Sequence, residues 1–171
     1  MDKNIIFEVW DNKFFNYTGL DRFRSLDDRN RTCLEDIGLP KNEILLLKFR
    51  GNLIRLSEEY KLREIGNYIL LGYEDERDYI CLDNKNQVVL VEKETGLSRF
   101  INSGVCEFID SLTEYKLFVD RRVNFDESEY NDNSQRYAKE LEVKLTAIDN
   151  NIKTAEYFWP VILEQIEFGM V

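Results

Sequence analysis

The chain has 171 residues, a formal net charge of −10, 43% hydrophobic residues and 33% charged residues. This length and composition predict one folded domain over residues 1–171, because a chain of this size hides roughly 70% of its unfolded surface. The negative charge argues against direct nucleic-acid binding, which needs a cationic face to neutralise phosphates. The acidic surface serves either solubility alone or contact with a basic protein.

The chain gives no sign of a membrane-spanning or exported protein. No run reaches the ~20 apolar residues that a membrane span needs, and the first residues, MDKNIIFEVW, lack the apolar core of a signal peptide. The three cysteines are widely and irregularly spaced in apolar surroundings, a pattern that favours free core thiols over a disulfide framework. We therefore expect a cytoplasmic protein in a reducing compartment.

The first predicted helix lies in the segment from Ser25 to Pro40. Ser25 is the expected N-cap, Gly38 is expected in the left-handed position after the last turn, and Pro40 prevents continuation. The aromatic segment before it, from Trp10 to Phe23, has no period and predicts loop and short turns.

A β region follows the first helix. Gly51-Asn52 is a candidate turn, and Glu94-Thr95-Gly96 fits a hairpin loop with a left-handed glycine. Neighbouring strands that are joined by short loops must run antiparallel. Five strands are predicted, over residues 43–49, 67–73, 78–83, 87–93 and 98–102.

Three helical segments end the chain, over residues 102–119, 132–148 and 159–169. The first is expected to take Asn102 or Ser103 as its cap. Its predicted buried face consists of Val105, Phe108, Ile109, Leu112 and Tyr115. The acidic residues 124–133 predict a mobile linker between the first and second of these segments. The order of helix, strands and helices predicts an α+β fold.

The sequence contains no recognisable catalytic motif. The chain has no histidine, which removes Ser-His and Cys-His nucleophile pairs and His-containing zinc sites. A calcium-loop pattern that begins at Asp83 fails because Lys85 occupies a ligand position and Val88 the required glycine. Carboxylate chemistry would need a closed pocket with strongly perturbed acids, so we expect no catalytic, cofactor-binding or metal-binding residues.

Several motifs, in this order, resemble the SUKH superfamily, particularly its fourth group of bacterial toxin-immunity proteins. They are IGLP (residues 37–40), YILLGYEDERDYICLD (68–83), VVLVEKETGLSRFINSGVCEFIDSL (88–112) and FWPVILEQIEFG (158–169). The resemblance implies one mixed, mainly antiparallel sheet wrapped by helices. It also implies a non-catalytic immunity protein that neutralises a cognate toxin domain, often a nuclease. Separately, we expect the free protein to be a monomer. The alternative is a housekeeping interaction module of the same fold without a toxin partner.

The acidic stretch EDERD, residues 74–78, lies where two predicted strands meet. It forms either a solvated turn that discourages edge pairing or a docking rim for a basic partner. Alternation places Tyr79 and Cys81 on one face of their strand and Ile80 and Leu82 on the other. The residues that we expect to bind a partner are Tyr73, Glu74, Asp75, Glu76, Asp78, Tyr79 and Asp83.

Overall fold

The computed structural model describes residues 1–59, 67–75, 77–122 and 127–170. Its β strands form one sheet in the order β1-β2-β3-β4-β5, with every neighbouring pair antiparallel. The strands are β1 (Leu47–Arg55), β2 (Ile69–Glu74), β3 (Asp78–Leu82), β4 (Val88–Val91) and β5 (Ser98–Asn102). The predicted α+β class with an antiparallel sheet is confirmed, and the described strands contain no parallel pair.

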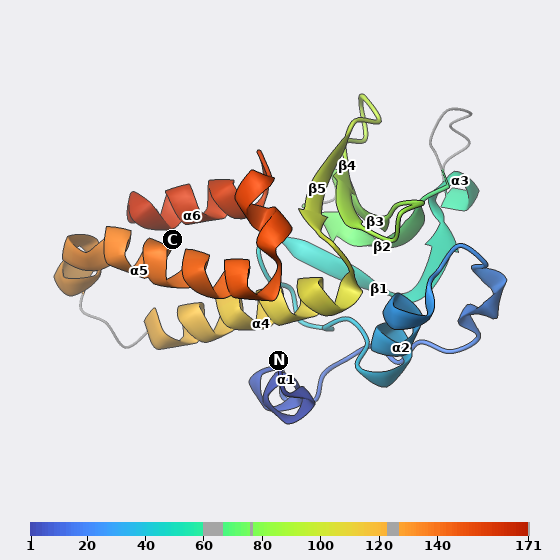
Figure 1. Cartoon of the computed structure of the whole chain (residues 1–171), viewed down its shortest axis with the longest axis horizontal. Coiled ribbons are helices and arrows are strands. Elements are labelled where there is room, and N and C mark those ends of the chain that lie inside the picture. The colour runs from blue at the N-terminus through green and yellow to red at the C-terminus, as the bar shows by residue number, and fades with distance from the viewer. Residues whose placement is uncertain (60–66, 76, 123–126, 171) are drawn as a thin grey trace.

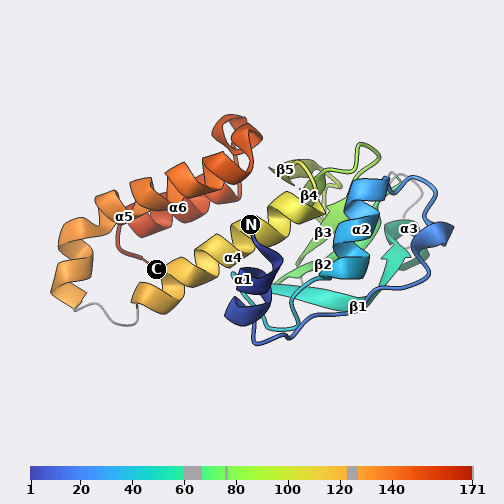
Figure 2. The ribbon, with the colours of Figure 1, turned by 60° about the horizontal axis from the view of Figure 1, so that its bottom comes forward.

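The α-helices other than the short one at Leu56–Glu59 gather on one face of the sheet and at one side of it (Figure 1). α4 runs from under the sheet toward the antiparallel pair α5 and α6, while α2 lies against the sheet beside α4 (Figure 2). The α-helices are α1 (Lys3–Val9), α2 (Asp28–Asp36), α3 (Leu56–Glu59), α4 (Val105–Arg122), α5 (Glu127–Ile148) and α6 (Trp159–Glu167). Two 3₁₀ helices, η1 (Leu20–Arg22) and η2 (Asn150–Thr154), complete the described elements.

Both faces of the sheet are buried. Ile80 and Leu82 point into the main core, together with the predicted apolar face of α4, while Tyr79 and Cys81 belong to a second cluster on the opposite face. This is the alternation that the sequence predicts. Trp10 is buried in the main core.

The first strand differs from its prediction. Residues 43–46 precede β1, because Leu45 and Leu46 both have positive φ and leave the extended conformation. Gly51-Asn52 is not a turn but part of β1, where a register shift between Phe49 and Ile54 accommodates the extra residues.

The helix boundaries also require corrections. Asp27, and not Ser25, caps α2 by accepting a hydrogen bond from the Asn30 backbone. The Asn30 side chain in turn accepts a 2.5 Å bond from the backbone N–H of Val105 at the start of α4. The side chain of Asn30, which is 75 positions away in the sequence, therefore caps α4 in place of the predicted Asn102 or Ser103.

Two further expectations are revised by the helices. The helix α1 was not predicted, because its seven residues carry too short an apolar pattern. The proposed linker over residues 124–133 is wrong from Glu127 onward, since α5 begins there; residues 124–126 lie outside the described residues.

The cysteines differ from the prediction of three free thiols. Cys33 on α2 and Cys106 at the start of α4 form a disulfide, and Cys81 is free and buried. The two partners are separated by 73 positions in the sequence, so only the packing of α2 against α4 brings them together.

Candidate partner-binding site

Three charged segments that are distant from one another in the sequence meet at one end of the sheet. Because the strands form an antiparallel meander, the entry to β1, the β2–β3 turn and the β4–β5 turn lie at the same end. The pairing of Leu47 with Glu74, and of Val91 with both Tyr79 and Ser98, fixes this arrangement. We call this region the sheet end. Its described acidic residues are Glu43, Glu74, Asp75, Asp78, Glu92 and Glu94.

Most of these carboxylates have partners within the sheet end. Asp75 lies 3.4 Å from the Arg77 guanidinium, and Asp78 accepts a 3.1 Å bond from the backbone N–H of Lys93. Glu92 accepts bonds from the Thr95 hydroxyl and from Arg99, which together hold its pKa below the usual value.

Glu74 differs from its neighbours. Its carboxyl group is half-buried, and neither a hydrogen bond nor an ion pair joins it to the rest of the described chain. Burial raises the pKa of Glu74, and the negative charges of Asp78 and Asp75 raise it further, while Arg77 opposes them. The ionised form of Glu74 is therefore disfavoured in this environment, and a cation bound beside the carboxylate would stabilise that form.

A hollow of about 260 Å³ opens beside Glu74. Its wall comes from the entry to β1 and from the start of α6, and includes Leu45, Leu46, Phe158 and Ile162. Leu46 is 57% exposed although it is apolar. We call this space the Glu74 hollow.

Backbone strain gathers at the same place. Leu45, Leu46 and Phe158 have φ of 53°, 62° and 60°, and such sparsely populated conformations cost roughly 1–3 kcal/mol each. Among the described residues, no other large apolar side chain has positive φ. Such strained residues cluster at binding and active sites, where the surrounding structure holds them in place.

The structure separates the predicted partner-binding residues into groups. Glu74, Asp75 and Asp78 lie together at the sheet end, and Glu76 lies outside the described residues. Tyr73 is half-buried, and its hydroxyl bonds to Arg50.

Two of the predicted residues do not lie on this surface. Tyr79 is only 1% exposed and belongs to the second core cluster. Asp83 lies beyond the opposite end of β3, where its carboxylate accepts bonds from the backbone N–H groups of Lys85 and Gln87. Asp83 therefore organises the β3–β4 turn, and strand direction alone places it away from the EDERD turn.

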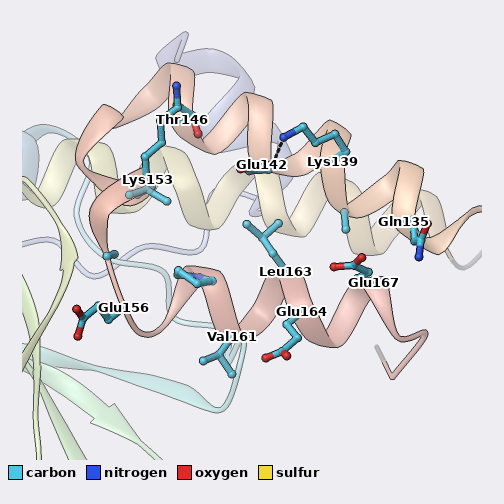
Figure 3. A pocket seen from close by; sticks show the side chains of 14 residues that line it. Gln135, Lys139, Glu142, Thr146, Lys153, Glu156, Val161, Leu163, Glu164 and Glu167 are labelled. Carbon is cyan, nitrogen blue, oxygen red and sulfur yellow. Dashed lines mark hydrogen bonds and ion pairs between the residues drawn. The ribbon is translucent and has the colours of Figure 1, made fainter.

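A second and larger hollow, of about 710 Å³, lies between α5, η2 and α6 (Figure 3). Leu163 points from α6 toward α5, and the Lys139–Glu142 ion pair lies at its edge (Figure 3). Carboxylates of Glu156, Glu164 and Glu167 also line it. Sequence reasoning missed both hollows, because each requires α6 to be placed against distant elements.

These two hollows adjoin one another. Val161 on α6 lines both of them, so they lie on either side of the start of that helix. A partner seated at the sheet end could therefore extend over α6.

The described residues give no support to two other kinds of site. Within them, no three His, Cys, Asp or Glu side chains come together in a way that could hold a metal ion. None of the helices in the described ranges is both long and apolar enough to cross a bilayer.

A family model, the SUKH-4 immunity protein, matches residues 21–165. This range runs from η1 into α6 and includes every residue that lines the Glu74 hollow. The chain belongs to the SUKH-4 immunity protein family. No curated protein and no solved structure matches it significantly. Membership in the SUKH-4 family confirms the resemblance that the sequence motifs indicated, and it supports a role in immunity.

Proposed function

We propose that this SUKH-4 protein binds and neutralises a cognate toxin domain in the bacterial cytoplasm, without catalysing a reaction. The family match over residues 21–165 is the observation that carries the proposal. The net charge of −10 supports a basic partner. Nucleases present cationic surfaces to hold phosphates, and an acidic protein can occupy such a surface.

The sheet end is the proposed contact surface, with Glu74, Asp75, Glu76 and Asp78 facing the toxin and Tyr73 at the margin. Leu46 and Leu97 are exposed beside the two outer strands of this surface, and Leu46 also forms part of the wall of the Glu74 hollow. Tyr79 is not part of the proposed surface because it is buried, and Asp83 is not part of it because it lies at the opposite end of β3.

The first test is co-expression with the toxin domain that the neighbouring gene encodes. We expect the protein to protect cells and to form a one-to-one complex with the purified toxin domain in light-scattering measurements. If cells die despite expression and the purified proteins do not associate, the immunity role is wrong. The housekeeping interaction module would then be the better explanation.

The contact surface is tested by reversing charges, with Glu74→Lys, Asp75→Lys and Glu76→Lys combined. Because exposed charges steer association, this variant should associate more slowly and with an altered dependence on salt. Stopped-flow fluorescence measures both quantities.

A matched control reverses three exposed acids on other elements, namely Glu8, Asp21 and Glu35. It changes the net charge by the same amount. If both variants slow association equally, net charge and not the sheet end governs the encounter.

The disulfide offers a separate test of the cytoplasmic location. Disulfides persist mainly in oxidising compartments, so a cytoplasmic protein should carry reduced Cys33 and Cys106 in living cells. Rapid alkylation during lysis, followed by mass spectrometry, measures their state. An oxidised pair in intact cells would contradict the cytoplasmic location.

A further inference from the structure

We propose that the Glu74 hollow receives one arginine side chain of the toxin, whose guanidinium pairs with the Glu74 carboxylate while its alkyl stem lies along the apolar wall. This inference rests on the proposed function and specifies the chemistry of its central contact.

The size and lining of the hollow suit a single side chain. Its volume of about 260 Å³ lies below the range of roughly 300–1,000 Å³ that is typical of small-molecule pockets. Leu45, Phe158 and Ile162 supply apolar wall, whereas Glu74 supplies the carboxylate and Gln165 an amide. A long apolar stem with a charged head matches this combination.

The charge of the hollow selects a cation. Glu74 is the acid of the described sheet end whose carboxyl group is half-buried and makes neither a hydrogen bond nor an ion pair with the described residues, and the nearby Asp75 and Asp78 add negative charge. A carboxylate in a partly desolvated site forms stronger charge-assisted bonds than one in water. A cation that enters the hollow therefore relieves an existing repulsion.

Arginine fits better than lysine for two reasons. Its guanidinium is more weakly hydrated than an ammonium group, and it pairs with a carboxylate through two parallel bonds. Tyr157, which also lines the hollow, already carries the guanidinium of Arg99 at 4.2 Å from its ring centroid. Because Arg99 already occupies this ring, the incoming guanidinium is assigned to the Glu74 carboxylate and not to Tyr157.

The wall of the hollow is fixed before a partner arrives. The backbone N–H of Asp75 donates a 3.0 Å bond to the carbonyl of Leu46, which ties the entry of β1 to the β2–β3 turn. The next residue after Phe158, Trp159, is anchored by a 3.0 Å bond from its indole N–H to Asn102. A preformed cavity loses less conformational entropy on binding.

The chemistry of the hollow is tested first with small probes. N-acetyl-arginine amide, its lysine analogue and its uncharged citrulline analogue are titrated into ¹⁵N-labelled protein, and backbone amide shifts are followed by NMR. We expect shifts at Leu45, Leu46 and Glu74 with the arginine probe, weaker shifts with lysine and none with citrulline. Glu74→Gln should abolish the arginine shifts. Unchanged amide signals, or equal shifts in the variant, overturn the proposal.

The role in the complex is tested with the cognate toxin domain. Glu74→Gln should weaken toxin binding by about 10- to 100-fold, because a partly desolvated charge pair loses one partner. The matched control is Glu94→Gln, an equal charge change at an exposed position of the same sheet end outside the hollow, which should change affinity by less than about threefold.

The outcomes separate this inference from the proposed function. Wild-type binding with unchanged affinity in Glu74→Gln refutes the arginine contact and leaves the immunity role standing. Arginine-specific shifts without any toxin binding refute the immunity role and keep the guanidinium site. A thermal unfolding temperature of Glu74→Gln that is not below that of the wild type rules out damage to the fold.

Discussion

Replacement of Asn102 by alanine tests the internal support of the proposed binding site. Asn102 is fully buried at the end of β5. Its side-chain oxygen accepts a 3.0 Å bond from the Trp159 indole, and its amide donates 3.2 Å bonds to Ser111 and Asp149. The side chain thus joins the sheet to α4, to the cap of η2 and to the start of α6.

The expected loss of stability follows from these three bonds. In Asn102→Ala the buried indole N–H of Trp159 loses its acceptor, which costs roughly 1–3 kcal/mol. Asp149 is less affected, since it keeps bonds from the backbone and hydroxyl of Ser103 at 2.7 and 2.9 Å. With the loss of packing included, we expect the free energy of unfolding to fall by about 3–5 kcal/mol, a large share of the 5–15 kcal/mol that is typical of a domain.

Urea unfolding followed by tryptophan fluorescence and by circular dichroism measures this loss. The matched control is Asn151→Ala, which removes an exposed 2.8 Å bond to Ser103 and should cost less than about 1 kcal/mol. A loss below about 1 kcal/mol in Asn102→Ala would show that the network does not hold α6 in place. The support that we assign to the Glu74 hollow would then fail as well.

Three further predictions concern packing, redox state and pH. Gly72→Ala should lower the free energy of unfolding by about 1–3 kcal/mol in urea, because the new methyl group would overlap the carbonyl of Lys48 on β1. Reduction of the Cys33–Cys106 disulfide in purified protein should cost about 2–4 kcal/mol in the same assay; no effect of dithiothreitol, or three free thiols by mass spectrometry before its addition, would contradict this. Because burial and nearby acids raise the pKa of Glu74 in the folded state, its ionisation destabilises the fold as pH rises from below the unfolded value through the raised one. The stability of Glu74→Gln relative to wild type should therefore rise between pH 4 and pH 7 in thermal unfolding, and a fall over that range would contradict the assigned environment.

The sequence predicts the sheet well because its evidence is local. Alternation and short hairpin loops locate β2 to β5 within a few residues, and the left-handed glycines Gly38 and Gly96 occupy the predicted positions. The apolar stripe of α4 is also buried as expected. Each of these features depends on neighbours within about ten positions.

Several of the failures involve contacts between residues that are distant in the sequence. The start of α4 is capped from α2 by Asn30, and Asn102 serves as a buried link instead of a cap. The Cys33–Cys106 pair and the positive φ of Leu45 depend in the same way on elements that meet only in the folded chain. No pattern within a single helix or strand predicts contacts between elements that are distant in the sequence.

The candidate site could be predicted only in outline. The EDERD turn was recognised as acidic, but the sequence has 33 acidic residues, and composition cannot rank them. The structure distinguishes these acids by their surroundings. The carboxyl group of Glu74 is half-buried and has no hydrogen-bond or ion-pair partner among the described residues, whereas Asp75 pairs with Arg77 and Asp78 accepts a bond from the Lys93 backbone. Tyr79, which is among the partner-binding residues predicted from the sequence, is assigned to the core by its burial alone.

This ranking separates two physical contributions to toxin binding. Exposed charges such as Asp75 act over a distance, so their effect belongs to the association rate and weakens as salt increases. A carboxylate inside an apolar hollow acts only after contact, so its effect belongs to the dissociation rate and is screened much less. Glu74→Gln alone should therefore show fast dissociation from a normally formed encounter. The charge-reversed sheet end, which also replaces Glu74, should show slow, salt-dependent association in addition to fast dissociation.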